Sequence, residues 1–167
     1  MNALGQDLKM RAREHFEIHE IHTSNGLEMY KGLTNTINVW WEKPYDTYFG
    51  FSFSPVIAAL KEDNEDSTYG EKITQQNIGL EYKKFPKIIL DKFYTRLGLG
   101  YSRLETNRGD RKNFFGTYSY LGLGYEVPFD SHGLALEVAY RYADYDNGLY
   151  VKTCLLYTSP SPRDGLL

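Results

Sequence analysis

The chain has 167 residues, a formal net charge of -3 and an aromatic content of 16%. This length fits one domain, and the small negative charge excludes a broad basic surface for nucleic acid. The sequence contains no run of about 18 apolar residues that could form a transmembrane helix. A membrane-spanning barrel is not excluded, because its strands alternate polar and apolar residues and average out as polar.

The N-terminal part of the chain predicts little regular structure. Residues 1–12 are expected to be an extension, and they lack the basic-then-apolar pattern of a signal peptide. Residues 15–22 predict a first, weak strand. It carries His15, His19 and His22, but on a strand His22 faces away from the other two, so a three-histidine metal site is not expected. We expect solvated histidines, no metal and no cofactor.

Alternation of apolar with small or polar residues recurs through the rest of the chain and predicts further strands. The alternating apolar positions are Ile37, Val39 and Trp41; Phe49, Phe51 and Phe53; Ile78, Leu80 and Tyr82; Phe93, Thr95, Leu97, Leu99 and Tyr101; Leu121, Leu123, Tyr125 and Val127; and Leu134, Leu136, Val138, Tyr140 and Tyr142. A last strand begins at Leu149 and is expected to be truncated.

The predicted strands are joined by alternately long and short connections. The long ones are residues 23–34, 61–72, 105–113 and a connection starting at Asp144, and the short ones contain EKPY, KKFPK and PFDSHG. This order is typical of an antiparallel meander with its long loops at one rim. The sequence therefore predicts an all-β, up-and-down barrel, with eight strands as the expected number.

Glycine occupies one face of two predicted strands, in the repeated string LGLGY at 97–101 and 121–125. Glycine on a water-exposed strand face only weakens the strand, whereas in a narrow barrel lumen it makes room for long side chains. Charged residues of both signs share this face, and we expect them to form a lumen ion-pair network. The expected members are Glu81, Arg96, Glu126, Glu137 and Arg141. The leucine and tyrosine face would then point toward lipid.

Aromatic residues gather near the short connections. Trp40, Trp41, Tyr45, Tyr48 and Phe129 are predicted to form an interfacial girdle, since amphipathic rings favour the headgroup level of a membrane. The alternative is a small core that closes one end of a soluble barrel.

Three strings carry a family resemblance: LGLGY at 97–101, LGLGYEVPF at 121–129 and GLALEVAYRYADYDNG at 133–148. They resemble the small bacterial outer-membrane β-barrel proteins, of the opacity type and the protein-A type, over residues 49–150 and more loosely from about residue 15. The resemblance implies a Gram-negative outer membrane, termini in the periplasm, and loops facing outward. It also implies lipid and lipopolysaccharide as partners, surface or host ligands at the loops, and a monomer. The chain departs from the family in lacking a signal peptide and a final strand that ends in an aromatic residue.

The C-terminal segment has a different character. Residues 154–164, CLLYTSPSPRD, resemble translated sequencing-adapter sequence, so residues 154–167 are expected to be a non-native tail and residues 13–153 the barrel. The single cysteine, Cys154, lies in this tail, so no disulfide is expected. The alternative is a genuine Ser/Pro-rich tail.

The expected role is structural or surface-interactive, without catalysis. One alternative is a lipid-modifying outer-membrane enzyme of the lipid A deacylase type, for which Ser131 and His132 offer a serine–histidine pair; the composition of a turn explains this pair equally well. The other alternative is a soluble, lipocalin-like barrel, which would turn its leucine and tyrosine face inward around an apolar cavity.

Overall fold

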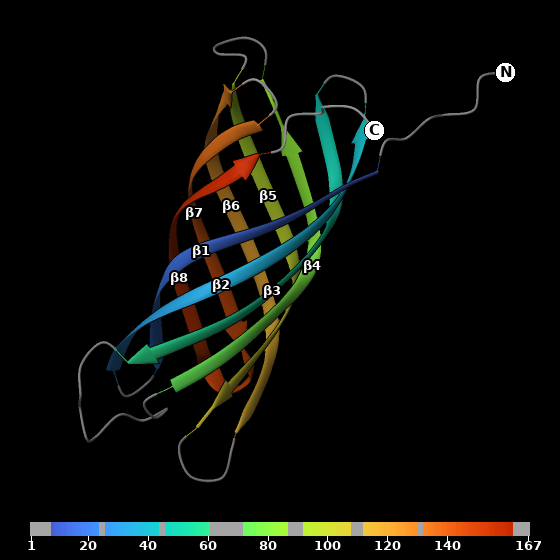
Figure 1. Cartoon of the computed structure of the whole chain (residues 1–167). Coiled ribbons are helices and arrows are strands. Elements are labelled where there is room, and N and C mark those ends of the chain that lie inside the picture. Colours follow the sequence, from blue (N-terminus) through green and yellow to red (C-terminus); the bar gives the residue numbers. More distant parts are fainter. Residues whose placement is uncertain are drawn as a thin grey trace, which may run out of the picture.

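The computed structural model describes residues 8–23, 26–43, 46–60, 72–86, 92–107, 112–129 and 132–161. These residues form eight antiparallel strands that close into a barrel (Figure 1). The strands are β1 (Leu8–Thr23), β2 (Gly26–Lys43), β3 (Thr47–Leu60), β4 (Lys72–Lys84), β5 (Phe93–Thr106), β6 (Asn113–Phe129), β7 (His132–Tyr145) and β8 (Leu149–Ser161). The predicted all-β, eight-stranded meander is confirmed.

Each strand pairs with its neighbours in sequence, and β1 pairs with β8 to close the barrel, from Phe16 opposite Leu156 to His22 opposite Tyr150. Because an even number of antiparallel strands returns to its starting rim, β1 begins and β8 ends at the same rim (Figure 1). We call this the terminal rim; it also carries the links β2–β3, β4–β5 and β6–β7. The opposite, distal rim carries the other four links.

Between β7 and β8 lies η1 (Asp146–Gly148), a single 3-10 turn in which Gly148 adopts a positive φ of 71°. Glycine tolerates this left-handed conformation because it has no Cβ. The described residues contain no helix that is long and apolar enough to cross a membrane.

The strand boundaries differ from the sequence prediction at both ends of the chain. Strand β1 begins at Leu8, which pairs with Trp41, so the barrel starts before residue 13. Strand β8 continues to Ser161, which pairs with Gly133, so the last strand is not truncated near Thr153. The pairing of residues 154–161 does not depend on their origin, and the adapter origin of the tail stays a prediction.

The long connection predicted over residues 23–34 is wrong, because β2 already begins at Gly26. Within that segment Tyr30, Gly32 and Thr34 are buried, while Lys31 is exposed. This is strand alternation in which the inner positions hold tyrosine, glycine and threonine instead of large aliphatic residues. Such a run resembles a loop in the sequence, although Tyr30 packs in the buried apolar cluster of the interior.

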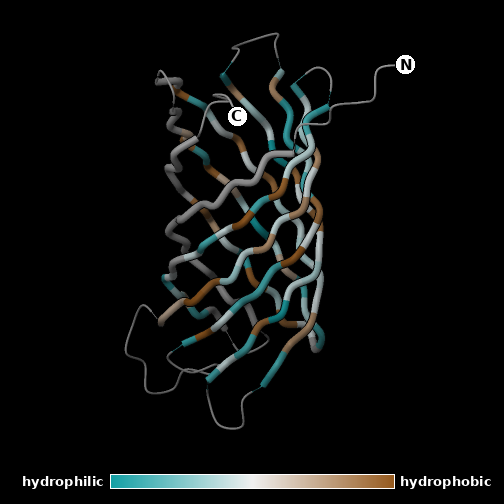
Figure 2. The backbone as a smooth tube through the Cα atoms, turned by 45° about the vertical axis from the view of Figure 1, so that its right-hand side comes forward, coloured by the Kyte–Doolittle hydropathy of each residue, from teal (hydrophilic) through white to brown (hydrophobic). Residues whose placement is uncertain are grey.

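The two faces of the wall have opposite character. Leu99, Leu123 and Val138 point outward and are 69%, 57% and 63% exposed, whereas Glu81 and Arg96 are buried inside. Figure 2 shows the resulting alternation of hydrophobic and hydrophilic residues along the strands. The predicted sidedness is confirmed for Leu97, Leu99, Leu121, Leu123, Leu136 and Val138, which all point outward, whereas a lipocalin-like barrel would turn this face inward. Other aliphatic residues, among them Leu104 and Leu155, lie inside.

The inward glycines lie against long side chains from neighbouring strands. A Cβ added at Gly124 would lie 2.6 Å from the Cε1 of Tyr94, and one at Gly98 would lie 3.2 Å from the Cγ of Glu81. A Cβ at Gly122 would lie 3.1 Å from the Cδ of Glu137. These distances are shorter than ordinary carbon contacts, so the repeated glycines provide the space in which the lumen side chains pack.

Candidate functional site

Three charged residues meet inside the barrel, one each from β4, β5 and β7. The Nε of Arg96 donates to the Oε2 of Glu81 at 2.7 Å, and the Nη2 of Arg96 contacts the same carboxylate. The Nη1 of Arg96 lies 3.6 Å from the Oε1 of Glu137. All three residues are buried. Each projects inward because it occupies an inner position of a strand in which successive side chains alternate between faces.

Neutral side chains complete the coordination of these charges. Asn38 donates to Glu81 at 3.2 Å and accepts from Arg96 at 3.3 Å. Glu137 accepts from the Tyr94 hydroxyl at 2.5 Å and from the Tyr120 hydroxyl. We call this group the Arg96 cluster: Asn38, Glu81, Tyr94, Arg96, Tyr120 and Glu137. Its ion pairs and hydrogen bonds offset the desolvation of two buried carboxylates.

Glu126 lies near the terminal rim and pairs with a residue that the sequence prediction missed. The Nζ of Lys83 donates to the Oε1 of Glu126 at 2.5 Å. The same ammonium lies 3.8 Å from the ring centroid of Tyr94 and 4.6 Å from that of Phe85. Lys83 follows Glu81 by two residues and so shares its inner face, a relation that could have identified it from the sequence.

Arg141 lies in the lumen on β7. Glu137, Ala139 and Arg141 are successive inner positions of that strand. It is buried, and its guanidinium carbon lies 5.9 Å from the ring centroids of both Tyr118 and Tyr120. These distances allow cation–π attraction. Of the five predicted network residues, the structure therefore joins Glu81, Arg96 and Glu137 directly, pairs Glu126 with Lys83, and places Arg141 beside the tyrosine rings.

The distal half of the lumen contains uncharged polar groups that the sequence prediction did not single out. Gln75 donates to Ser102 at 3.1 Å and to the Tyr145 hydroxyl at 2.7 Å, and Ser102 donates to Asn77 at 2.7 Å. Thr36 and Ser54 share a further hydrogen bond of 2.8 Å. The interior thus holds polar side chains along both halves, and beside them a cluster of buried apolar residues that includes Val56, Ile73, Leu104 and Val151.

The predicted aromatic girdle is corrected at Trp40. Its side chain is 2% exposed and lies inside the barrel, 5.6 Å from the Arg96 guanidinium. Consecutive strand residues face opposite sides, so Trp40 and Trp41 cannot both point outward. Trp41 is partly exposed and contacts the ring of Phe51 edge-to-face at 5.6 Å.

Tyr48 lies at the terminal rim, where its ring is 6.0 Å from that of Phe85 and its hydroxyl donates to Glu42 at 3.3 Å. Tyr45 lies outside the described residues, and the side chain of Phe129 does too, although its backbone ends β6. An aromatic girdle at this rim therefore stays a prediction at Tyr45 and Phe129. Tyr48 is corrected in the same way as Trp40, because it precedes the outward Phe49 and so occupies an inner position of β3.

Two further sequence hypotheses fall on side chains outside the described set. Ser131 is not among the described residues, and neither is the side chain of His132. The histidine side chains of β1 also lie outside it. Catalysis at the turn and metal binding at the histidines are therefore untested.

The outer face of β2–β7 carries a band of large apolar side chains, the outer band. Successive strands contribute paired residues to it, such as Phe51, Leu80 and Leu99, which lie opposite one another across β3, β4 and β5. The large exposed members are Ile37, Phe49, Phe51, Phe53, Ile57, Ile78, Leu80, Phe93, Leu97, Leu99, Tyr101, Phe115, Leu121, Leu123, Leu136, Val138 and Tyr140. Such a surface is far more extended than the scattered apolar residues of a soluble protein.

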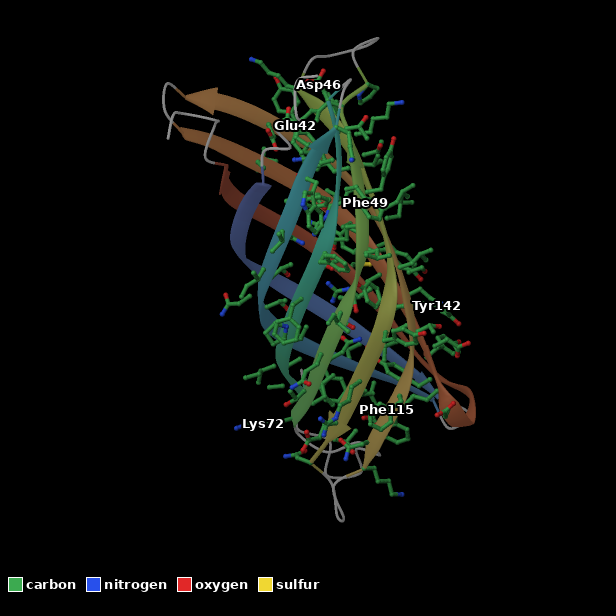
Figure 3. The ribbon with its side chains drawn as sticks, turned by 90° about the vertical axis from the view of Figure 1, so that its right-hand side faces the viewer. Glu42, Asp46, Phe49, Lys72, Phe115 and Tyr142 are labelled. Carbon is green, nitrogen blue, oxygen red and sulfur yellow. The ribbon has the colours of Figure 1, made fainter. Side chains whose placement is uncertain are left out.

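Charged residues, exposed or partly exposed, lie at both rims of the described wall. On β4 the exposed residues Lys72 and Lys84 stand at the distal and terminal ends, with Ile78 and Leu80 between them. Figure 3 shows Lys72 at one end of the barrel, Glu42 and Asp46 at the other, and Phe49 at the level between. The outer wall is thus apolar in its middle and charged at its edges.

Solved structures with this fold include Neisserial surface protein A, with a TM-score of 0.62 and 12% identity over 95% of this chain and 100% of that chain. Ail, the attachment invasion locus protein of Yersinia pestis, was solved in complex with the heparin analogue sucrose octasulfate. Its structure matches with a TM-score of 0.60 and 13% identity over 90% of this chain and 96% of that chain. Another Ail structure matches with a TM-score of 0.55 and 15% identity over 93% of this chain and 97% of that chain. No protein-family model and no curated protein sequence matches the chain. At these identities, the likeness shows the fold.

Proposed function

We propose that this chain is an integral outer-membrane β-barrel whose role is structural or surface-interactive rather than catalytic. The observation that carries the proposal is the sidedness of the closed wall. A band of large apolar side chains faces outward, and buried ion pairs lie inside. In water this arrangement would expose many large hydrophobic residues, which is unfavourable. In lipid the outer face is in its preferred surroundings, while the inner charges are compensated within the lumen.

The height of the outer band supports a membrane setting. On β5 it runs from Phe93 to Tyr101, both of which are exposed. Eight residue steps at about 3.3 Å each cover about 26 Å along the strand. With a tilt of about 40° this becomes about 20 Å along the barrel axis, close to the roughly 25 Å apolar belt of outer-membrane barrels.

The filled lumen supports a scaffold rather than a wide pore. The Arg96 cluster spans the interior from Asn38 on β2 to Glu137 on β7, and the Lys83–Glu126 pair lies beside it. An eight-stranded barrel has an interior that side chains can fill completely. We therefore assign the five predicted network residues, together with Lys83, to a structural plug.

The distal rim is proposed to be the surface-binding end, with the termini in the periplasm, as the family resemblance implies. Lys31, Lys72 and Lys112 are exposed at this rim. Ail, a structural neighbour, was solved with the heparin analogue sucrose octasulfate. A sulfated saccharide is a suitable probe here, because clustered lysines attract polyanions. Lipopolysaccharide and other outer-membrane lipids would surround the band, and a monomer is the proposed state.

The test is insertion of the full chain into preformed lipid vesicles. We expect the refolded chain to float with the vesicles, to resist trypsin along its strands, and to run at different positions on a gel before and after boiling. A folded chain that stays in the vesicle-free fraction as a soluble monomer would contradict the proposal. For the surface role, sucrose octasulfate should bind the inserted barrel more weakly after Lys72→Glu.

A further inference from the structure

Two lysines stand in one row on the outer wall at the terminal rim. Lys43 ends β2, Thr47 begins β3 and Lys84 ends β4, and the register places Thr47 opposite both lysines. The lysines are exposed and Thr47 is partly exposed, and each is an even number of residues from an outward apolar residue of its own strand. Neighbouring strands are about 4.8 Å apart, so the two lysine backbones are about 10 Å apart, with only a short side chain between them. We call these three residues the lysine row.

The next outward row toward the middle of the wall is aromatic. Trp41, Phe49 and Tyr82 lie opposite one another across the same three strands. Phe49 is exposed, and the other two are partly exposed. The row after that contains Phe51 opposite Leu80, within the outer band. The wall therefore changes from cationic to aromatic to apolar in three successive rows, the order in which a lipid presents its headgroup, its glycerol and its acyl chains.

The two ammonium groups of the lysine row have no carboxylate partner within the described part of the chain, where no ion pair includes Lys43 or Lys84. Two carboxylates stand at the same rim, those of Glu42 and Asp46 (Figure 3). Glu42 occupies an inner position of β2 and accepts from the Tyr48 hydroxyl at 3.3 Å, and Asp46 lies in the link before β3. Two exposed cations at the edge of a lipid-facing wall attract an anion that the lipid supplies.

We propose that the lysine row binds the headgroup of one anionic glycerophospholipid. Both ammonium groups contact its phosphate, and the aromatic row packs against its glycerol and the first carbons of its acyl chains. A zwitterionic lipid binds more weakly, because its own ammonium repels the lysines. The inference rests on the proposed function, which turns the terminal rim toward the periplasm, where the leaflet consists of glycerophospholipids and not of lipopolysaccharide.

Tryptophan fluorescence can detect this lipid locally. The chain has two tryptophans, of which Trp40 is buried in the lumen, whereas Trp41 lies on the outer wall in the row next to Lys43. The experiment inserts the full chain into phosphatidylcholine vesicles that contain a minor fraction of phosphatidylglycerol or of phosphatidylethanolamine, with the acyl chains brominated close to the headgroup. We expect brominated phosphatidylglycerol to quench Trp41 at a lower mole fraction than brominated phosphatidylethanolamine does.

The lysines should account for this preference. Each lysine at a headgroup layer contributes a factor of about five to the binding of an anionic lipid. Lys84→Gln should therefore lower the preference about fivefold, and the double variant Lys43→Gln, Lys84→Gln should abolish it. Lys92→Gln is the matched control, because Lys92 is exposed at the same rim just before β5 and is not part of the lysine row. It removes the same charge and should leave the preference unchanged.

Two results would overturn the lipid site: equal quenching of the wild-type chain by the two brominated lipids, or equal losses of preference in Lys84→Gln and Lys92→Gln. The second result would mean that the lipid is attracted by the charge of the whole rim. The boiling-dependent gel shift is measured on every variant to establish folding. If the wild-type chain inserts into vesicles yet shows one of these results, the site is wrong and the proposed function stands. If it does not insert, both fail.

Discussion

Replacing Arg96 with Met should strongly destabilise the inserted barrel. Met keeps the length and apolar stem of Arg but removes the charge between Glu81 and Glu137. Glu137 would keep its bonds from Tyr94 and Tyr120, whereas Glu81 would keep only the Asn38 amide among the contacts described. Leaving a buried carboxylate without its counter-charge costs about 3–5 kcal/mol.

The source of this cost can be isolated by a second substitution. Glu81→Gln in the Arg96→Met background removes the uncompensated charge and leaves a side chain that can still bond Asn38. We expect the double variant to recover about 2 kcal/mol of the loss, because neutral amides are far cheaper to bury than carboxylates. Recovery would show that the charge, and not packing, determines the cost.

The matched control lies on the same strand. Arg103 is 43% exposed and its ion pair with Glu105 is 3.7 Å long, so Arg103→Met should change stability by less than about 0.5 kcal/mol. The assay is urea unfolding in vesicles, followed by the gel shift and by tryptophan fluorescence. Equal stability of the Arg96→Met and Arg103→Met variants would refute the buried-network reasoning.

Three further changes test other parts of the wall. Gly124→Val should lower the free energy of unfolding by about 1–3 kcal/mol in the same urea titration, because its Cβ would press on the Tyr94 ring, whose hydroxyl donates to Glu137. An unchanged free energy of unfolding would mean that the ring is free to move. Leu99→Arg should lower the free energy of unfolding in vesicles by about 2–4 kcal/mol, whereas Gln76→Arg near the distal rim should lower it by about 0–1 kcal/mol. Equal losses at the two positions would count against a lipid-facing position of Leu99. Arg141→Leu should lower the temperature of the gel-shift transition, because it removes a lumen charge; an unchanged transition would exclude it from the network.

The alternation of the sequence was sufficient to predict the fold and the sidedness. In LGLGY the alternation of strand residues alone places Leu97 and Leu99 on one face and Gly98 on the other. In the closed barrel one of these faces is inside. The same parity, applied throughout, would have placed Trp40 inside and added Lys83 to the network. Residues that are close in the sequence of a strand, such as Trp40 and Trp41, lie on opposite faces, so the face and not the closeness in sequence decides which residues act together.

Other features depend on the three-dimensional register and could not be predicted. Gln75, Ser102 and Tyr145 come from β4, β5 and β7, and only the closed barrel brings them within hydrogen-bond distance. The segment around Tyr30 resembles a loop in the sequence because its inner positions, Tyr30, Gly32 and Thr34, hold no large aliphatic residue. A hollow on the outer wall, lined among others by Leu99, Ser119 and Tyr142, is likewise a property of two adjacent registers and not of any one strand.

The most direct test of the sidedness is the oxygen accessibility of nitroxide spin labels at single cysteines, in the chain with Cys154 replaced by Ser and inserted into vesicles. Labels at Leu99→Cys and Val138→Cys should collide readily with oxygen, which concentrates in hydrocarbon. A label at Ser102→Cys, whose native side chain is buried in the lumen, should be shielded and immobile. High oxygen accessibility at position 102 together with shielding at positions 99 and 138 would contradict the account.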